Sequence, residues 1–106
     1  MKIKVGVKEP GKPIEFREVE DELKTYQGLV GGYIEVARTN LLDIMAIVNE
    51  EGKLLDLEPN IDVGYDVLVG TVIFVGEGGD NFVSLTDEDV EDIKEEYGEE
   101  DEDDEE

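Results

Sequence analysis

The sequence contains no cysteine, no histidine and no tryptophan. These absences exclude disulfide bonds, thiol nucleophiles, imidazole bases and zinc sites built on Cys or His ligands. The single serine, Ser84, has no histidine to activate it. General acid–base chemistry would fall to carboxylates, tyrosines and a few lysines. We therefore expect a protein that is not an enzyme and needs no cofactor.

Long hydrophobic runs are also missing. No apolar run approaches the roughly 20 residues that span a bilayer. The first residues, MKIKVGVKEPG, alternate apolar with charged side chains instead of forming the apolar block of a signal peptide. A chain without cysteine is compatible with a reducing compartment. We expect a cytoplasmic protein that does not bind membranes.

Positive charge is scarce, with 9 Lys and Arg against 31 Asp and Glu and a net charge of −22. Residues 1–53 hold 8 basic and 10 acidic side chains, residues 54–98 hold 1 and 13, and all 8 residues of 99–106 are acidic. Such a surface repels nucleic acid, which proteins bind through cations, and attracts basic proteins. We expect a basic protein partner and no direct binding to nucleic acid.

The 106 residues suffice for one domain, which we place at 1–98, followed by a disordered acidic tail at 99–106. Alternation predicts a strand over 2–8, and a turn at EPGKP joins it to a partner strand around 14–16. Helical spacing predicts a helix over 19–27 that ends at Gly28 or at the Gly31-Gly32 pair.

Further strands are predicted over YIEVAR (33–38) and LLDIMAIVN (41–49), although LLDIMAI also fits helical periodicity. KLLDL (53–57) predicts a short return strand that closes near Pro59. DVLVGTVIFV (66–75) predicts one strand with a bend or bulge at Gly70, and FVSL forms a hairpin with its second half.

The last helix has the strongest signals. Thr86 is a hydroxyl N-cap, the first turn is acidic, Val90, Ile93 and Tyr97 share one face, and Gly98 ends the pattern. The fold class that follows is α+β, a small mostly antiparallel sheet with two helices and a disordered acidic C-terminal tail.

The glycine-rich and acidic motifs do not match known phosphate-binding or calcium-binding loops. GVKEPGK lacks the Ser or Thr of a phosphate loop, and GEGGDN lies between strands, so both are predicted turns. An EF-hand loop beginning at Asp87 would need glycine at its sixth position, where Asp92 stands. We therefore predict no metal site.

The outer face of the last helix is the main candidate site for a partner. Its acidic residues are Asp87, Glu88, Glu91, Asp92, Glu95 and Glu96. Acids along one helical stripe stand about 5–6 Å apart, the same order as the phosphates of a nucleic-acid strand, so the helix could imitate one. The alternative is a plain solvated face with a tail that keeps the domain in solution.

Four segments resemble a family of small phage-, plasmid- and Firmicute-encoded proteins known only as a domain of unknown function. They are LVGGYIEV (29–36), NEEGKLLDLEPN (49–60), VGT (69–71) and FVSLTDED (82–89). The resemblance covers nearly all of residues 1–97 and implies a mobile-element origin, hence a location in the host cytoplasm. It brings no catalytic residues, and the acidic tail departs from the family pattern.

Two classes of function remain open. The first is a binding protein that inhibits a basic, nucleic-acid-binding host protein, in an anti-defence or regulatory role. The second is a small-ligand module, such as a sponge for a signalling nucleotide, whose loops would contain Gly31, Gly32, Tyr33, Asn49 and Lys53. These residue types also suit ordinary turns, which leaves an accessory domain with a solubilising tail as a further alternative. An exposed sheet edge could pair across a homodimer.

Overall fold

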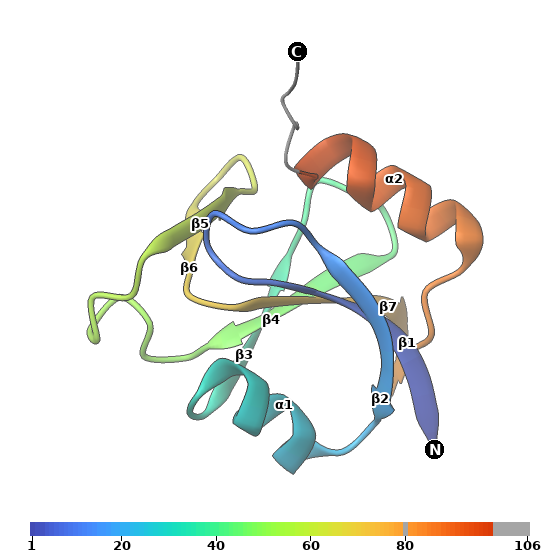
Figure 1. The fold of residues 1–106 in the computed structure, drawn as a ribbon, viewed down its shortest axis with the longest axis horizontal. Helices are drawn as coiled ribbons and strands as arrows, with labels where there is room; N and C mark the ends of the chain where they lie inside the picture. Colours follow the sequence, from blue (N-terminus) through green and yellow to red (C-terminus); the bar gives the residue numbers. More distant parts are fainter. Residues whose placement is uncertain (80, 99–106) are drawn as a thin grey trace.

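The computed structural model describes residues 1–79 and 81–98 (Figure 1). The strands are β1 (Lys2–Lys8), β2 (Glu15–Glu20), β3 (Ile34–Arg38), β4 (Ile44–Asn49), β5 (Pro59–Asp62), β6 (Val67–Val69), β7 (Val72–Gly78) and β8 (Asn81–Val83). The helices are α1 (Leu23–Val30) and α2 (Asp87–Tyr97). The predicted tail, residues 99–106, lies outside the described residues.

The main sheet has the strand order β2-β1-β7-β4-β3, and β8 pairs with the end of β7. Strands β5 and β6 form a separate two-stranded sheet, and every strand pair in the described part is antiparallel. Strands β2 and β3 therefore lie at the two ends of this order. The predicted class, a mostly antiparallel sheet with two helices, is confirmed.

Both faces of the main sheet are covered, as Figure 1 shows, with α1 on one face and α2 and the β5–β6 hairpin on the other. One core lies under α1 and contains Ile3, Val5, Val7, Tyr26, Val30, Ile47, Ile73 and Val75. The other contains Ile44, Ala46, Val48, Ile61, Val63, Leu68, Val72, Phe74, Leu85, Ile93 and Tyr97. The central strand β7 supplies residues to both cores, which explains why its sequence is apolar without alternation.

The N-terminal hairpin is confirmed, but the predicted start of the first helix is wrong. Val19 and Glu20 belong to β2, where Val19 pairs with Ile3 across the hairpin. The helix begins after Glu22 and ends at Gly31, which has a left-handed φ of 83°. Pairing with β1 therefore outweighs the helical spacing that begins at Val19.

The segment 41–49 forms strand β4 from Ile44 onward, whereas the predicted strand KLLDL is wrong. Residues 51–56 form consecutive turns, in which the Leu55 N–H donates to the Glu51 carbonyl at 2.9 Å and the Leu57 N–H to the Gly52 carbonyl at 3.0 Å. Leu54 is 86% exposed. These local hydrogen bonds satisfy the backbone without a neighbouring strand.

The single strand predicted over 66–75 is also wrong. It is two strands, β6 and β7, in different sheets, separated at Gly70 with φ of 75°. A Cβ at this position would lie 2.7 Å from Leu57 Cδ1. A left-handed backbone turns the chain out of the first sheet, so the glycine marks a change of sheet and not a bulge.

Candidate functional site

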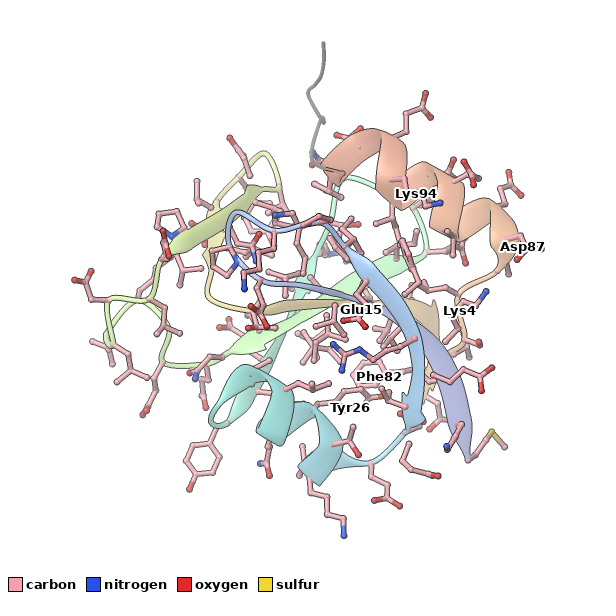
Figure 2. All side chains as sticks on the ribbon, viewed as in Figure 1. Lys4, Glu15, Tyr26, Phe82, Asp87 and Lys94 are labelled. Carbon is pink, nitrogen blue, oxygen red and sulfur yellow. The ribbon has the colours of Figure 1, made fainter. Side chains whose placement is uncertain are left out.

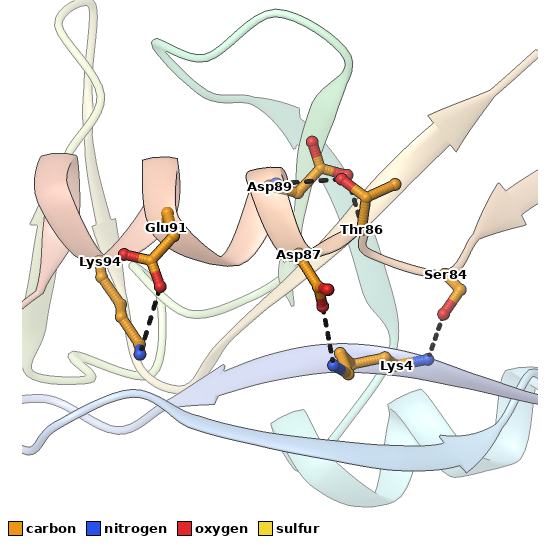
Figure 3. A network of polar contacts seen from close by, with 7 residues as sticks. All are labelled: Lys4, Ser84, Thr86, Asp87, Asp89, Glu91 and Lys94. Atoms are coloured by element: carbon orange, nitrogen blue, oxygen red, sulfur yellow. Dashed lines mark hydrogen bonds and ion pairs between the residues drawn. The ribbon is translucent and has the colours of Figure 1, made fainter.

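Helix α2 is attached at its N-terminal end to Lys4 of β1 (Figure 3). The Lys4 N–H donates to Ser84 Oγ at 2.8 Å, and the Lys4 carbonyl accepts from the Leu85 N–H at 2.9 Å. Lys4 Nζ lies 3.9 Å from Asp87 Oδ1. The segment that leads into the helix is therefore fixed to the sheet, which sets where α2 begins.

The first turn of α2 is closed by a reciprocal capping box. The Asp89 N–H donates to Thr86 Oγ1 at 3.0 Å, and the Thr86 N–H donates to Asp89 Oδ2 at 3.0 Å. The predicted start at Thr86 is confirmed, and Gly98 is the C-cap, with an extended backbone (φ −66°, ψ 146°). Acidic side chains in this turn interact favourably with the helix dipole.

The inner face of α2 is anchored by Ile93 and Tyr97, both buried. The Tyr97 ring stacks on Phe74 with centroids 5.3 Å apart and an interplanar angle of 22°. Tyr97 Oη accepts a hydrogen bond from the Asn40 N–H at 2.7 Å. Desolvation by burial raises the pKa of Tyr97. These contacts fix the rotation of the helix about its axis.

The rest of the helix surface presents all the acids that the sequence predicted as partner-binding. Asp87, Glu88, Glu91, Asp92, Glu95 and Glu96 are exposed. Three of them have partners among the described residues, namely Asp87 with Lys4 at 3.9 Å, Glu91 with Lys94 at 3.9 Å and Glu96 with Asn40 Nδ2 at 3.3 Å. Figure 2 shows Asp87 at the beginning of α2, on the outer margin of the molecule.

The other three acids, Glu88, Asp92 and Glu95, form what we call the acidic stripe. Their spacing of four and three residues places them on one side of α2. Within residues 1–79 and 81–98 none of them has an ion pair or side-chain hydrogen bond. The stripe is thus a fixed row of carboxylates facing solvent.

Most cations of the described chain are already engaged with carboxylates. Those that lie 3.9 Å or less from one are Lys4, Lys12, Arg17, Lys53 and Lys94. Lys8 is buried, and its Nζ donates to Asn60 Oδ1 at 2.9 Å. Few cations are therefore left to offset the negative potential around the acidic stripe.

The predicted ligand loops meet only in part. Gly31, Gly32, Tyr33 and Asn49 line one small cavity of about 270 Å³. Lys53 lines a different, larger cavity, to which Asn49 also contributes. The structure therefore does not gather the five residues around a single pocket.

Asn49 has a structural role between α1 and the turn after β4. Its Nδ2 donates to the Val30 carbonyl at 3.1 Å, and its Oδ1 accepts from the Glu51 N–H at 2.7 Å. A Cβ at Gly32 would lie 2.9 Å from Asn49 Nδ2. The glycine therefore makes room for the amide, which ties the C-terminal end of α1 to β4.

The larger cavity, which we call the β3 cleft, has a volume of about 720 Å³. It is lined by Glu35, Val36, Ala37, Arg38, Val48, Asn49, Glu50, Gly52, Lys53, Leu54, Tyr65, Asp66, Val67, Leu68 and Val69. Val48 and Leu68 are buried at its base, whereas Val36 and Val67 are 42% and 41% exposed. The cleft lies between the outer strand β3 and the β5–β6 hairpin.

Polar contacts close one end of the β3 cleft. Lys53 Nζ donates to Asp66 Oδ1, and this hydrogen bond lowers the pKa of Asp66. Tyr65 Oη contacts the backbone of Arg38, accepting from its N–H and donating to its carbonyl, both at 3.2 Å. The hairpin tip is thereby fastened to the end of β3.

Sequence reasoning missed this cleft because it joined β6 to β7. A signal was present in the turn between β5 and β6, where the Gly64 N–H donates to Asp62 Oδ1 at 2.8 Å and Gly64 has φ of 99°. An Asp followed two residues later by glycine, between two short β-rich runs, is typical of a hairpin turn.

The described residues contain neither a cluster suited to a metal ion nor a helix suited to a membrane. No group of three or more His, Cys, Asp or Glu side chains in residues 1–79 and 81–98 is arranged to hold a metal ion. In that same part of the chain no helix has the length and apolar character required to cross a membrane.

Comparison with known proteins identifies a sequence family and nothing closer. Residues 1–98 match the sequence profile of the family described as Domain of unknown function (DUF3846). No curated protein and no solved structure matches the chain.

Proposed function

Because the chain belongs to the DUF3846 family, whose function is unknown, we propose a role from its own surface. The protein is a non-enzymatic binding protein of phage or mobile-element origin. It acts in the host cytoplasm, where the outer face of α2 binds and inhibits a basic, nucleic-acid-binding host protein. The role is anti-defence or regulatory, and the protein itself does not bind nucleic acid.

The observation that carries this proposal is the acidic stripe, formed by Glu88, Asp92 and Glu95. Its carboxylates are exposed and unpaired within the described chain, so no internal cation must be displaced when a partner binds. A fixed row of charges also loses little conformational entropy on binding, apart from the side chains themselves.

Rigidity of the helix supports imitation of a nucleic-acid strand. The capping box at Thr86 and the stacking of Tyr97 on Phe74 hold α2 in one orientation. On an α-helix the Cβ atoms of residues three and four apart are about 5–6 Å apart, so the side chains of the stripe start from evenly spaced points. A cationic groove that accepts a row of phosphates could accept this row instead.

The eight acids of residues 99–106 add to the same potential. Their contribution acts over about 10 Å at 0.1 M salt and less at higher salt. We assign them long-range attraction of the partner, while the folded acidic stripe supplies the specific contact. Steering of this kind changes the association rate more than the lifetime of the complex.

Capture of partners from a host lysate tests the proposal. Tagged full-length protein and a version that ends at Gly98 are each used at about 50 mM and about 500 mM salt, a range over which screening becomes severe. Double-stranded DNA is added as competitor. We expect both versions to capture the same basic protein, which DNA and high salt release.

A matched pair of variants separates the stripe from total charge. The test variant carries Glu88→Gln, Asp92→Asn and Glu95→Gln, and the control carries Glu18→Gln, Glu22→Gln and Glu58→Gln at exposed positions elsewhere. The test variant should retain about tenfold less partner, whereas the control should resemble the wild type. Equal losses would mean that total charge alone attracts the partner. No capture by any version would favour an accessory domain with a solubilising tail.

A further inference from the structure

The outer edge of β3 carries backbone groups that face away from the sheet. The Tyr33 carbonyl accepts from the Glu50 N–H at 2.8 Å, so the backbone groups of Tyr33 point toward β4. The Arg38 N–H and carbonyl both contact Tyr65 Oη, so the backbone groups of Arg38 point away from β4. Backbone groups alternate between the two sides of a strand from residue to residue. The N–H and carbonyl of Val36 must therefore also point away from β4, as those of Arg38 do.

By the same alternation the backbone N–H and carbonyl of Ile34 also point away from β4. Within the described chain, the N–H and carbonyl groups of Ile34 and Val36 have no hydrogen bond on this side. Tyr65 covers only the last residue of β3, at Arg38. An outer strand with unpaired donors and acceptors is a template for a further strand.

The β3 cleft runs beside this edge and supplies side-chain contacts. Ala37 belongs to the core under α2, together with Val48 and Leu68, so Glu35 and Ala37 lie on the cleft face of β3. Ile34 belongs to the core under α1, so the Val36 side chain points to that other face of β3, while Val36 as a residue still borders the cleft. A strand added at this edge would therefore place alternate side chains over the cleft.

Charge decides what kind of strand fits. Glu35 and Glu50 line the cleft, are exposed, and have no ion pair within residues 1–79 and 81–98. Asp66 is paired with Lys53, which leaves Arg38 as the other charged group of the lining. A second copy of the chain would bring a further net charge of −22 to this edge, which opposes association.

We propose that the outer edge of β3 binds an extended, lysine- or arginine-containing peptide segment of a partner protein by strand addition. The residue opposite Val36 exchanges two backbone hydrogen bonds with it, and its side chain packs on Val36. The flanking basic residues lie over the β3 cleft, where their aliphatic stems contact Leu68 and Val67 and their charges meet Glu35 and Glu50. This surface is separate from the acidic stripe on α2.

Labelled octapeptides of alternating lysine and valine test the proposal, with binding to the full chain followed by fluorescence polarisation. One peptide is unmodified, one is N-methylated at its valines and one at its lysines, so all three have equal charge. In the proposed register a valine lies opposite Val36, and the N–H groups of all the valines point toward β3, whereas those of the lysines point away. Methylation of the valines should therefore weaken binding about tenfold or more, and methylation of the lysines should change it little. Equal binding of all three peptides would overturn strand addition.

A variant of the protein gives the reciprocal test. Val36→Pro removes the outward N–H, and proline is tolerated in an outer strand whose N–H faces solvent. Val36→Thr keeps the N–H and is the control. We expect the unmodified peptide to bind the Pro variant about tenfold more weakly and the Thr variant within about twofold of the wild type.

Amide exchange on the wild type keeps the test valid if the Pro variant does not fold. The unmodified peptide should protect the Ile34 and Val36 amides from exchange with solvent. Protection confined to α2 would show simple attraction to the acidic stripe and would overturn the proposal. So would absence of binding, equal binding of an alternating glutamate-valine peptide, or self-association of the protein through this edge.

Discussion

Asn60 and Lys8 contact each other twice, from strands in different sheets. Asn60 Oδ1 accepts from Lys8 Nζ at 2.9 Å, and Asn60 Nδ2 donates to the Lys8 carbonyl at 2.8 Å. The same Nδ2 donates to the Gly70 carbonyl at 2.7 Å. One amide side chain therefore fastens the β5–β6 hairpin to β1 and to the turn where the chain changes sheet.

Replacement of this amide should loosen the hairpin. Asn60→Ala removes three hydrogen bonds, two with buried Lys8 and one with Gly70, and should lower the free energy of unfolding by about 1–3 kcal/mol. Asn81→Ala, at an exposed position of β8, is the control and should change stability by less than about 0.5 kcal/mol. Urea denaturation measures both. Equal effects would mean that Asn60 does not hold the two sheets together.

Gly70 should tolerate alanine poorly for two separable reasons. Its φ is 75°, and an added Cβ would lie 2.7 Å from Leu57 Cδ1. Gly11 has nearly the same φ, 76°, with no atom within 4 Å of an added Cβ. Gly11→Ala therefore measures backbone strain alone, about 1 kcal/mol. Gly70→Ala should cost about 1–3 kcal/mol more because of the steric clash, as thermal unfolding would show. Equal losses would mean that Leu57 moves aside freely.

Tyr26 should make stability depend on alkaline pH. Burial, followed by the hydrogen bond to Asp21 Oδ1 at 2.7 Å, raises the pKa of Tyr26 above its ordinary value of 10.0. The unfolded chain then loses this proton first, so the stabilisation is present below pH 10 and is lost as the pH rises.

The difference between wild type and Tyr26→Phe isolates this effect. At neutral pH the variant should be about 1 kcal/mol less stable, because it lacks the hydrogen bond to Asp21. The difference should shrink between about pH 9 and pH 11 as the unfolded wild type ionises. Denaturant unfolding across this range gives the values. A difference that stays constant would show that Tyr26 ionises equally in both states.

The start of α2 should depend on the Thr86 hydroxyl. Thr86→Ala removes the acceptor for the Asp89 N–H and should destabilise the protein by about 1 kcal/mol. Thr86→Ser keeps an oxygen at the same place and should remain within about 0.5 kcal/mol of the wild type. Amide exchange of the first helical turn should rise only in the alanine variant. The capping assignment fails if serine and alanine behave alike.

Local signals predicted the parts of the fold whose contacts are local. The hairpin of β1 and β2, the β7–β8 hairpin and the Thr86 cap all depend on neighbours in sequence, and all are present. The errors fall where distant contacts decide. Val19 continues a strand because Ile3 lies opposite, and Gly70 separates two strands because Leu57 packs against it.

The two candidate sites also differ in whether local or distant contacts form them. The outward position of Glu88, Asp92 and Glu95 follows from helical spacing against buried Ile93 and Tyr97, which the sequence contains in full. The β3 cleft needs the hairpin to fold over β3, a placement that depends on a contact of Tyr65 with Arg38. No spacing rule connects residues 27 positions apart.

The position of β7 in the middle of the sheet has a consequence for synthesis of the protein. Strand β7 is the neighbour of β1, β4 and β8, so the main sheet is not complete until Val83, at the end of β8, has left the ribosome. Pairings between distant segments also form slowly. Until β7 is available, the hairpin of β1 and β2 and the helix α1 lack their packing partners in the sheet. Apolar residues such as Val5 then stay exposed to solvent. Helix α2 emerges after these strands, onto a domain that has only just closed.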